Sequence, residues 1–166
     1  MYLDNFRDKM SMTSLDGIKA SLENMLKGIE RYNPDNIITL EQYVQMQAKE
    51  NGYDLEANLA LLKLYQFNPG QMNLPYVEMV LLKALTSLPN SDFSLCKSLL
   101  TVDVLEHCPS IKNITYLADL LETCMFKEFW AKLHSPGMPE LVRPIAGFED
   151  SIRKVRNSKN IFLDEV

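Results

Sequence analysis

Histidine and cysteine are the residues best suited to bind a metal or to act as a nucleophile, and this chain has few of them. The histidines are His107 and His134, and the cysteines are Cys96, Cys108 and Cys124. No CxxC or HxxxH pair occurs, although such spacings let two side chains bind one zinc ion. We interpret the adjacent His107 and Cys108 as a surface histidine at a helix end and a small buried thiol, and Cys124 as part of the core.

Other kinds of catalytic site also lack their usual residues. The carboxylate pairs Asp119–Glu122 and Glu149–Asp150 are local neighbours, and such neighbours usually form a solvated helix face. The 6 glycines are dispersed, so the sequence has neither a phosphate-binding loop nor a GxSxG motif. We therefore expect no catalytic residue, no metal and no cofactor, and a protein that acts by binding other macromolecules.

One cluster of positive charge could contact RNA. Arg153, Lys154, Arg156 and Lys159 lie close together in the sequence, and clustered cations bind phosphate backbones. The same pattern is typical of a solvated helix end, and nearby acidic residues reduce the positive charge. The net charge of the whole chain is −5, which does not favour nucleic acid. Direct RNA contact through these four residues is one of two open interpretations.

The composition indicates that helices position these side chains. Of the 166 residues, 46% are hydrophobic and 23% are charged, as in a globular protein with a core of its own. Helix-favouring residues such as leucine and methionine outnumber the β-branched residues that favour strands. No apolar run approaches the roughly 20 residues that span a bilayer, and no secretion signal accompanies the cysteines. The prediction is an all-α intracellular protein without a membrane segment.

Apolar residues recur at helical spacing in a series of segments, which are separated by proline, asparagine and glycine. Seven or eight short helices with short connections favour stacked antiparallel helical hairpins. The expected helices cover residues 15–32, 39–51, 55–67, 75–88, 92–100, 109–121, 126–133 and 148–155.

Several local signals sharpen these boundaries. Thr39 and Gln42 have the spacing of a capping box. Asp54 is expected to cap the following helix, and Pro75 suits a first helical turn. Ile29 continues the apolar stripe of the first helix, so we expect it on the buried face.

An aromatic-Asn-Pro triplet occurs twice, as Tyr32-Asn33-Pro34 and as Phe67-Asn68-Pro69, 35 residues apart. That distance fits one helical hairpin of a repeat protein. The triplet therefore favours an α–α superhelix that is analogous to HEAT repeats.

The chain is predicted to have four parts. Residues 1–13 are expected to form a flexible N-terminal extension, and residues 14–134 a HEAT-like helical-repeat domain. Residues 135–147 hold three prolines and two glycines, which is typical of a linker. Residues 148–166 are expected to form a short helix with an atypical tail.

A longer series of motifs points to a family. Examples are Leu26-Lys27-Gly28-Ile29-Glu30-Arg31, Leu81-Leu82-Lys83-Ala84-Leu85 and Tyr116-Leu117-Ala118-Asp119-Leu120. Together the motifs cover residues 26–34, 47–51, 53–60, 62–69, 81–85, 91–93, 116–124 and 147–154. In order and spacing they resemble the subunit K family of eukaryotic translation initiation factor 3, over about residues 20–155.

The resemblance implies a stack of HEAT-like hairpins followed by a winged-helix domain of the kind found in the proteasome lid and the signalosome. It implies a non-catalytic subunit of an assembly that binds the small ribosomal subunit and supports recruitment of mRNA and initiator tRNA. The implied partners are the other initiation factor 3 subunits, subunit L above all, and the implied location is the cytoplasm, with the nucleus as a second possibility. The alternative is a helical-repeat adaptor in a proteasome-lid-like or signalosome-like complex.

The end of the sequence departs from the family pattern. After residue 155 the chain does not resemble the expected continuation, so we expect the winged helix to be missing and residues 148–166 to be only its beginning. Phe148, Ile152 and Val155 form an apolar stripe at helical spacing. In a full family member the stripe would pack on the winged helix. Here it must fold back on the helical stack or stay exposed as a partner-binding surface.

Overall fold

The structure is a computed structural model that describes residues 15–163, with the backbone alone for residues 15, 16, 156 and 158–163. The predicted extension, residues 1–13, lies outside the described residues. Within the described range every regular element is a helix, which confirms the all-α prediction. No helix in this range is both long enough and apolar enough to cross a bilayer.

The described residues form ten α-helices and three short 3₁₀ helices. The α-helices are α2 (Leu15–Met25), α3 (Ile37–Glu50), α4 (Leu55–Phe67), α5 (Leu74–Leu85), α6 (Asp92–Ser98), α7 (Val102–His107), α8 (Pro109–Glu122), α9 (Phe126–Leu133), α10 (Met138–Val142) and α11 (Phe148–Leu163). The 3₁₀ helices are η1 (Gly28–Tyr32), η2 (Pro34–Asn36) and η3 (Pro69–Gln71).

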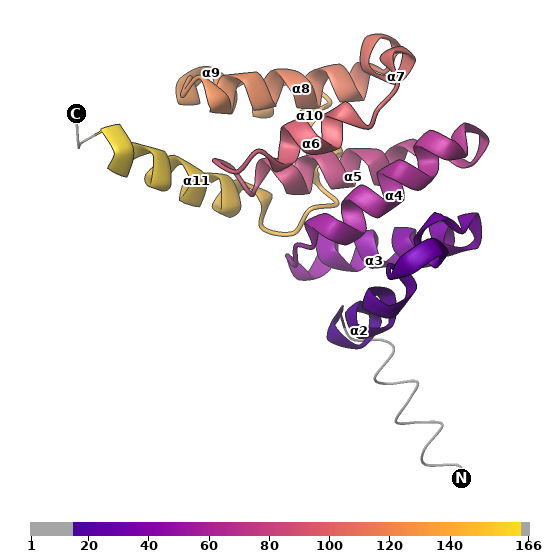
Figure 1. Ribbon diagram of the computed structural model, residues 1–166. Coiled ribbons are helices and arrows are strands. Elements are labelled where there is room, and N and C mark those ends of the chain that lie inside the picture. The colour runs from indigo at the N-terminus through magenta and orange to yellow at the C-terminus, as the bar shows by residue number, and fades with distance from the viewer. Residues whose placement is uncertain (1–14, 164–166) are drawn as a thin grey trace.

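The shortest α-helix of the described range is α10, with 5 residues. Consecutive helices pack in pairs, α3 with α4, α5 with α6 and α8 with α9. Helix α5 lies in the middle of the stack, because it also packs against α3 on one side and α8 on the other. The stack therefore runs from α2 at one end to α8 and α9 at the other (Figure 1).

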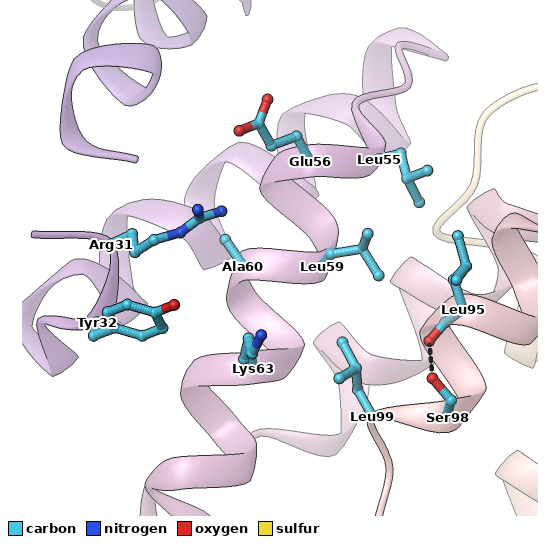
Figure 2. Close-up of a pocket in the computed structure, with 10 residues that line it drawn as sticks. All are labelled: Arg31, Tyr32, Leu55, Glu56, Leu59, Ala60, Lys63, Leu95, Ser98 and Leu99. Atoms are coloured by element: carbon cyan, nitrogen blue, oxygen red, sulfur yellow. Dashed lines mark hydrogen bonds between the residues drawn. The ribbon is translucent and has the colours of Figure 1, made fainter. Parts of the chain in front are cut away.

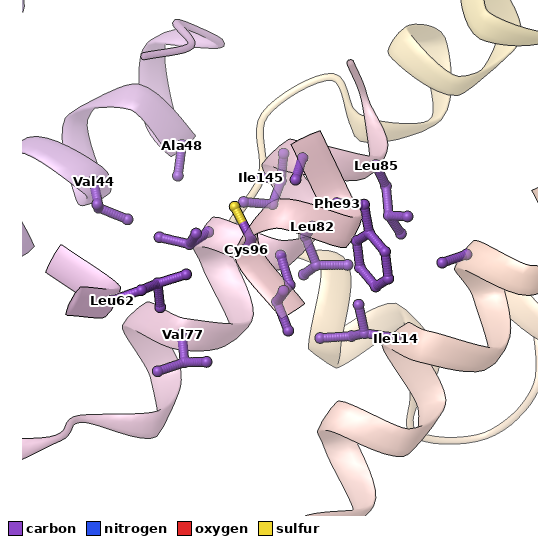
Figure 3. Packing of buried hydrophobic residues seen from close by; sticks show 14 of the residues in the cluster. Val44, Ala48, Leu62, Val77, Leu82, Leu85, Phe93, Cys96, Ile114 and Ile145 are labelled. Carbon is purple, nitrogen blue, oxygen red and sulfur yellow. The ribbon is translucent and has the colours of Figure 1, made fainter. Parts of the chain in front are cut away.

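The core is one continuous cluster of buried apolar side chains along this stack. Leu82 and Leu85 of α5 lie near Phe93 of α6 and Ile114 of α8, and Ile145 reaches the same region from the segment before α11 (Figure 3). Because α5 is buried nearly all round its C-terminal half, it joins the two ends of the stack into one body.

The first predicted helix is shorter than the sequence indicated. Helix α2 ends at Met25, and Gly28 follows with a φ of +66°, which favours glycine and turns the chain into η1. As a result Ile29 is 84% exposed, so its predicted burial is wrong. The predicted capping box is also wrong, because α3 already begins at Ile37 and Thr39 lies inside the helix.

Other local predictions are confirmed. The Asp54 side chain accepts a hydrogen bond from the Ala57 backbone N–H at 3.1 Å at the start of α4. Pro75 lies in the first turn of α5, and Pro109 begins α8. The two aromatic-Asn-Pro triplets each lead into a 3₁₀ turn, η2 or η3.

The segment predicted as a linker, residues 135–147, contains α10 and contributes Met138 and Ile145 to the core. Its end is fixed by a hydrogen bond of 2.8 Å from the Ala146 N–H to the Ala48 carbonyl in α3. Helix α11 then runs to Leu163, beyond the predicted end at residue 155. The four-part division of the chain stays a prediction.

Candidate protein-interaction surface

Helix α4 is held against α3 by buried polar groups. The Gln47 amide nitrogen donates to Asn58 Oδ1 at 2.9 Å, and the Gln47 oxygen accepts from the Asp54 N–H at 2.8 Å. Gln47 and Asn58 are both buried, so each satisfies the other where water is excluded. Because these bonds fix the register of α4 on α3, they also fix the face that α4 turns away from α3.

That opposite face of α4 forms the floor of a groove of about 530 Å³ (Figure 2). The floor residues are Leu55, Glu56, Leu59, Ala60 and Lys63. Spacings of four residues place them in two adjacent rows on one side of the helix. The floor is therefore apolar in its centre and carries a charge of opposite sign toward each end.

Two other segments form the walls of the groove. Arg31 and Tyr32 of η1 stand on one side, and Leu95 of α6 and Leu99, which directly follows α6, stand on the other (Figure 2). Tyr32 makes an edge contact with Phe67 at 6.0 Å between ring centres, so the apolar surface continues past the groove. Leu95 is 46% exposed, which is a large area for a leucine beside other leucines.

The charged groups of the groove have no ionic partner within the described part of the chain. Arg31 lies over the Tyr32 ring at 5.9 Å, and neither it nor Lys63 or Glu56 takes part in any of the ion pairs there. Two cations and one anion therefore line an apolar floor and face solvent.

The sequence held a partial signal for this groove. Leu55 and Leu59 share the apolar stripe of α4 with Leu62 and Tyr65, yet only the last two are buried. The apolar stripe of α4 is therefore wider than the part of the helix that is buried in the core. The apolar residues that the core does not fully cover, Leu55 and Leu59, lie in the groove floor. The walls could not be found in the same way, because η1 and α6 are distant in sequence.

The apolar stripe predicted as a partner-binding surface lies inside the molecule. Phe148, Ile152 and Val155 are all buried and belong to the core cluster. The stripe thus folds back on the helical stack, which is one of the two arrangements expected from the sequence. Partner contact through these residues stays a prediction, and it would require α11 to leave the core.

The basic cluster is partly neutralised. The Arg153 guanidinium pairs with Asp150 at 2.8 Å and with Glu149 at 3.1 Å, and it lies over the Trp130 ring at 5.2 Å. Lys154 is exposed, whereas the side chains of Arg156 and Lys159 lie outside the described residues. Nucleic-acid contact through these four residues stays a prediction.

The potential metal ligands and nucleophiles are scattered. Within residues 15–163 no three His, Cys, Asp or Glu side chains gather into a possible metal site. His107 is exposed near the end of α7, as predicted. Cys124 is exposed with a φ of +59°, so its predicted burial is wrong: it lies in the turn between α8 and α9. Burial, with a smaller effect of Asp92, raises the pKa of the Cys96 thiol to about 12.

The sequence of this chain matches a known protein family and several of its named members. Residues 71–156 match the model of the CSN8/PSMD8/EIF3K family. Proteins named eukaryotic translation initiation factor 3 subunit K are 53% identical in Xenopus tropicalis and 52% identical in Homo sapiens, each over 143 residues. The match covers 86% of this chain and 64% of either relative, so the chain spans somewhat less than two thirds of their length.

The matched region of the family model runs from η3 through α5, the centre of the stack, to the buried part of α11. It therefore includes the helices that build most of the core, and it covers more than half of the sequence. The chain belongs to the CSN8/PSMD8/EIF3K family.

Proposed function

We propose that this chain acts as a non-catalytic subunit of a eukaryotic translation initiation factor 3 complex. The observation that carries the proposal is 53% identity, over 86% of the chain, to a relative named as subunit K of that factor. An all-helical stack with an exposed apolar groove also suits a protein that binds other proteins.

The partners that we propose are the other subunits of the factor, with subunit L as the nearest neighbour. Through the assembled factor the chain would associate with the small ribosomal subunit and support recruitment of mRNA and initiator tRNA. The site of action would be the cytoplasm, where translation begins.

A second candidate is an adaptor subunit in a proteasome-lid-like or signalosome-like complex. It is favoured by the family description, which groups CSN8 and PSMD8 with EIF3K. Both candidates are assembly subunits that bind proteins, so they differ in the complex that contains them.

Affinity purification with quantitative mass spectrometry separates the two candidates. The tagged chain is expressed in a eukaryotic cell line beside the tagged human relative. We expect both baits to enrich initiation factor 3 subunits. Enrichment of proteasome-lid or signalosome subunits in their place would favour the second candidate. Recovery of neither set by the chain, while the human relative recovers its own complex, would reject both.

A further inference from the structure

The groove on α4 has the shape of a helix-binding site. Its floor extends from Leu55 to Lys63, which is about 12 Å along α4 at 1.5 Å per residue. The lining residues on η1 and α6 flank α4 on its two sides (Figure 2). An amphipathic helix that lies along such a groove buries residues spaced three and four apart, two or three turns in all.

The groove also shows a polarity along α4. Glu56 lies beside Leu55 near the start of the helix, while Lys63 lies two turns further on, with Tyr32 on the adjacent wall (Figure 2). Arg31 adds a second positive charge on the same wall. Because none of the three charges is paired within the described residues, a ligand can complement all of them.

We propose that this groove binds an amphipathic helix of a partner protein, with leucine-like residues on its apolar face and an acidic residue against Arg31 and Lys63. The net positive charge of the groove selects an acidic helix, although the chain as a whole is acidic. The proposal rests on the proposed function, because an assembly subunit needs docking sites for its neighbours.

The test uses two hydrocarbon-stapled helical peptides as probes. Both carry leucines at positions i, i+4 and i+7. One has glutamates at the flanking positions, and the other has lysines at the same places. Binding to the full chain is measured by fluorescence anisotropy with labelled peptides, up to about 1 mM protein, so that weak binding is also detected. We expect the acidic peptide to bind more tightly than the basic one.

Three variants assign the binding to the groove. Leu95→Ser is expected to weaken binding of the acidic peptide about tenfold, because it removes apolar area from one wall. Val102→Ser is the matched control, since Val102 is also exposed but does not line the groove, and it should leave binding unchanged. Lys63→Glu should weaken binding of the acidic peptide and strengthen binding of the basic one.

The proposal is overturned if neither peptide binds, if both bind equally, or if Leu95→Ser and Val102→Ser behave alike. It is also overturned if the chain self-associates and Leu95→Ser abolishes that association, because the groove would then bind a second copy. Co-purification with initiation factor 3 does not depend on these peptides. If the peptides do not bind but the chain co-purifies with initiation factor 3, only the helix-binding role of the groove is rejected. If the acidic peptide binds but the chain does not co-purify with the factor, only the proposed function is rejected.

Discussion

Replacing Ile152 with alanine tests whether α11 is part of the core. Ile152 is 0% exposed, and it lies between Phe148 and Val155 on the buried side of the helix. The substitution removes the side chain beyond Cβ and leaves a cavity, which costs about 2–5 kcal/mol at fully buried sites. Helix α11 is the last element of the described range, so it can detach before the rest unfolds, which limits the observed loss. We therefore expect a decrease of about 2–3 kcal/mol.

The measurement is urea unfolding followed by circular dichroism, with hydrogen exchange of the α11 amides as a second readout. Arg153→Ala is the matched control in the same turn. Arg153 is exposed and makes surface ion pairs and a contact with the Trp130 ring, so its loss should change the free energy of unfolding by about 1 kcal/mol. If the two variants unfold at the same urea concentration, and the α11 amides exchange equally fast in both, then α11 does not pack on the core.

Three further perturbations address buried polar groups and thiols. Gln47→Ala should lower the free energy of unfolding by about 2–3 kcal/mol in thermal or urea melts, because Asn58 then lacks its buried partner; an effect below about 0.5 kcal/mol would contradict this. Burial lowers the pKa of Lys83 below its usual 10.5 in the folded protein. Between the folded pKa and 10.5 the unfolded chain binds more protons than the folded protein, so the free energy of unfolding rises with pH in this window. Below the folded pKa the buried charge lowers the stability by its full cost. Lys83→Met should therefore stabilise most near neutral pH, and its advantage in urea melts should shrink at higher pH; a constant difference would refute the reasoning. In native protein at pH 8, the exposed Cys124 should react with Ellman's reagent well before the buried Cys96. Mass spectrometry of peptides gives the order of labelling. Earlier labelling of Cys96 in any variant that stays folded would contradict this prediction.

The helices of the central stack could be predicted because their signals are local. The Asp54 side chain caps α4 by accepting a hydrogen bond from the Ala57 N–H, only three residues further along the chain. Pro75 and Pro109 fix the first turns of α5 and α8. Apolar residues at helical spacing mark the buried faces of α5 and α8. Such signals need no knowledge of what packs on each helix, so the fold class followed from the sequence.

The errors arose where a change of backbone direction overrides the pattern of residue types. Ile29 continues an apolar stripe, but the left-handed backbone at Gly28 ends the helix before it. Thr39 and Gln42 have the spacing of a capping box, but η2 leads directly into α3 two residues earlier. Cys124 follows an apolar helix, yet it occupies a turn. In each case a change of backbone direction decided the outcome.

The candidate site was the least predictable part. Its floor is a stripe of α4, but its walls come from η1 and α6, and only the tertiary structure brings the three together. The sequence instead indicated Phe148, Ile152 and Val155, whose apolar spacing is the same for a docking surface and for a buried face. Periodicity shows that such a stripe must be covered, and it does not show by what.

Sedimentation of the tagged chain through a sucrose gradient tests the central claim most directly. Fractions of a eukaryotic cell extract are probed for the chain, for initiation factor 3 subunits and for the small ribosomal subunit, beside the tagged human relative as control. We predict that the chain migrates with the factor and with the small ribosomal subunit. The account would be contradicted if the chain stayed at the top of the gradient while the human relative migrated with the factor.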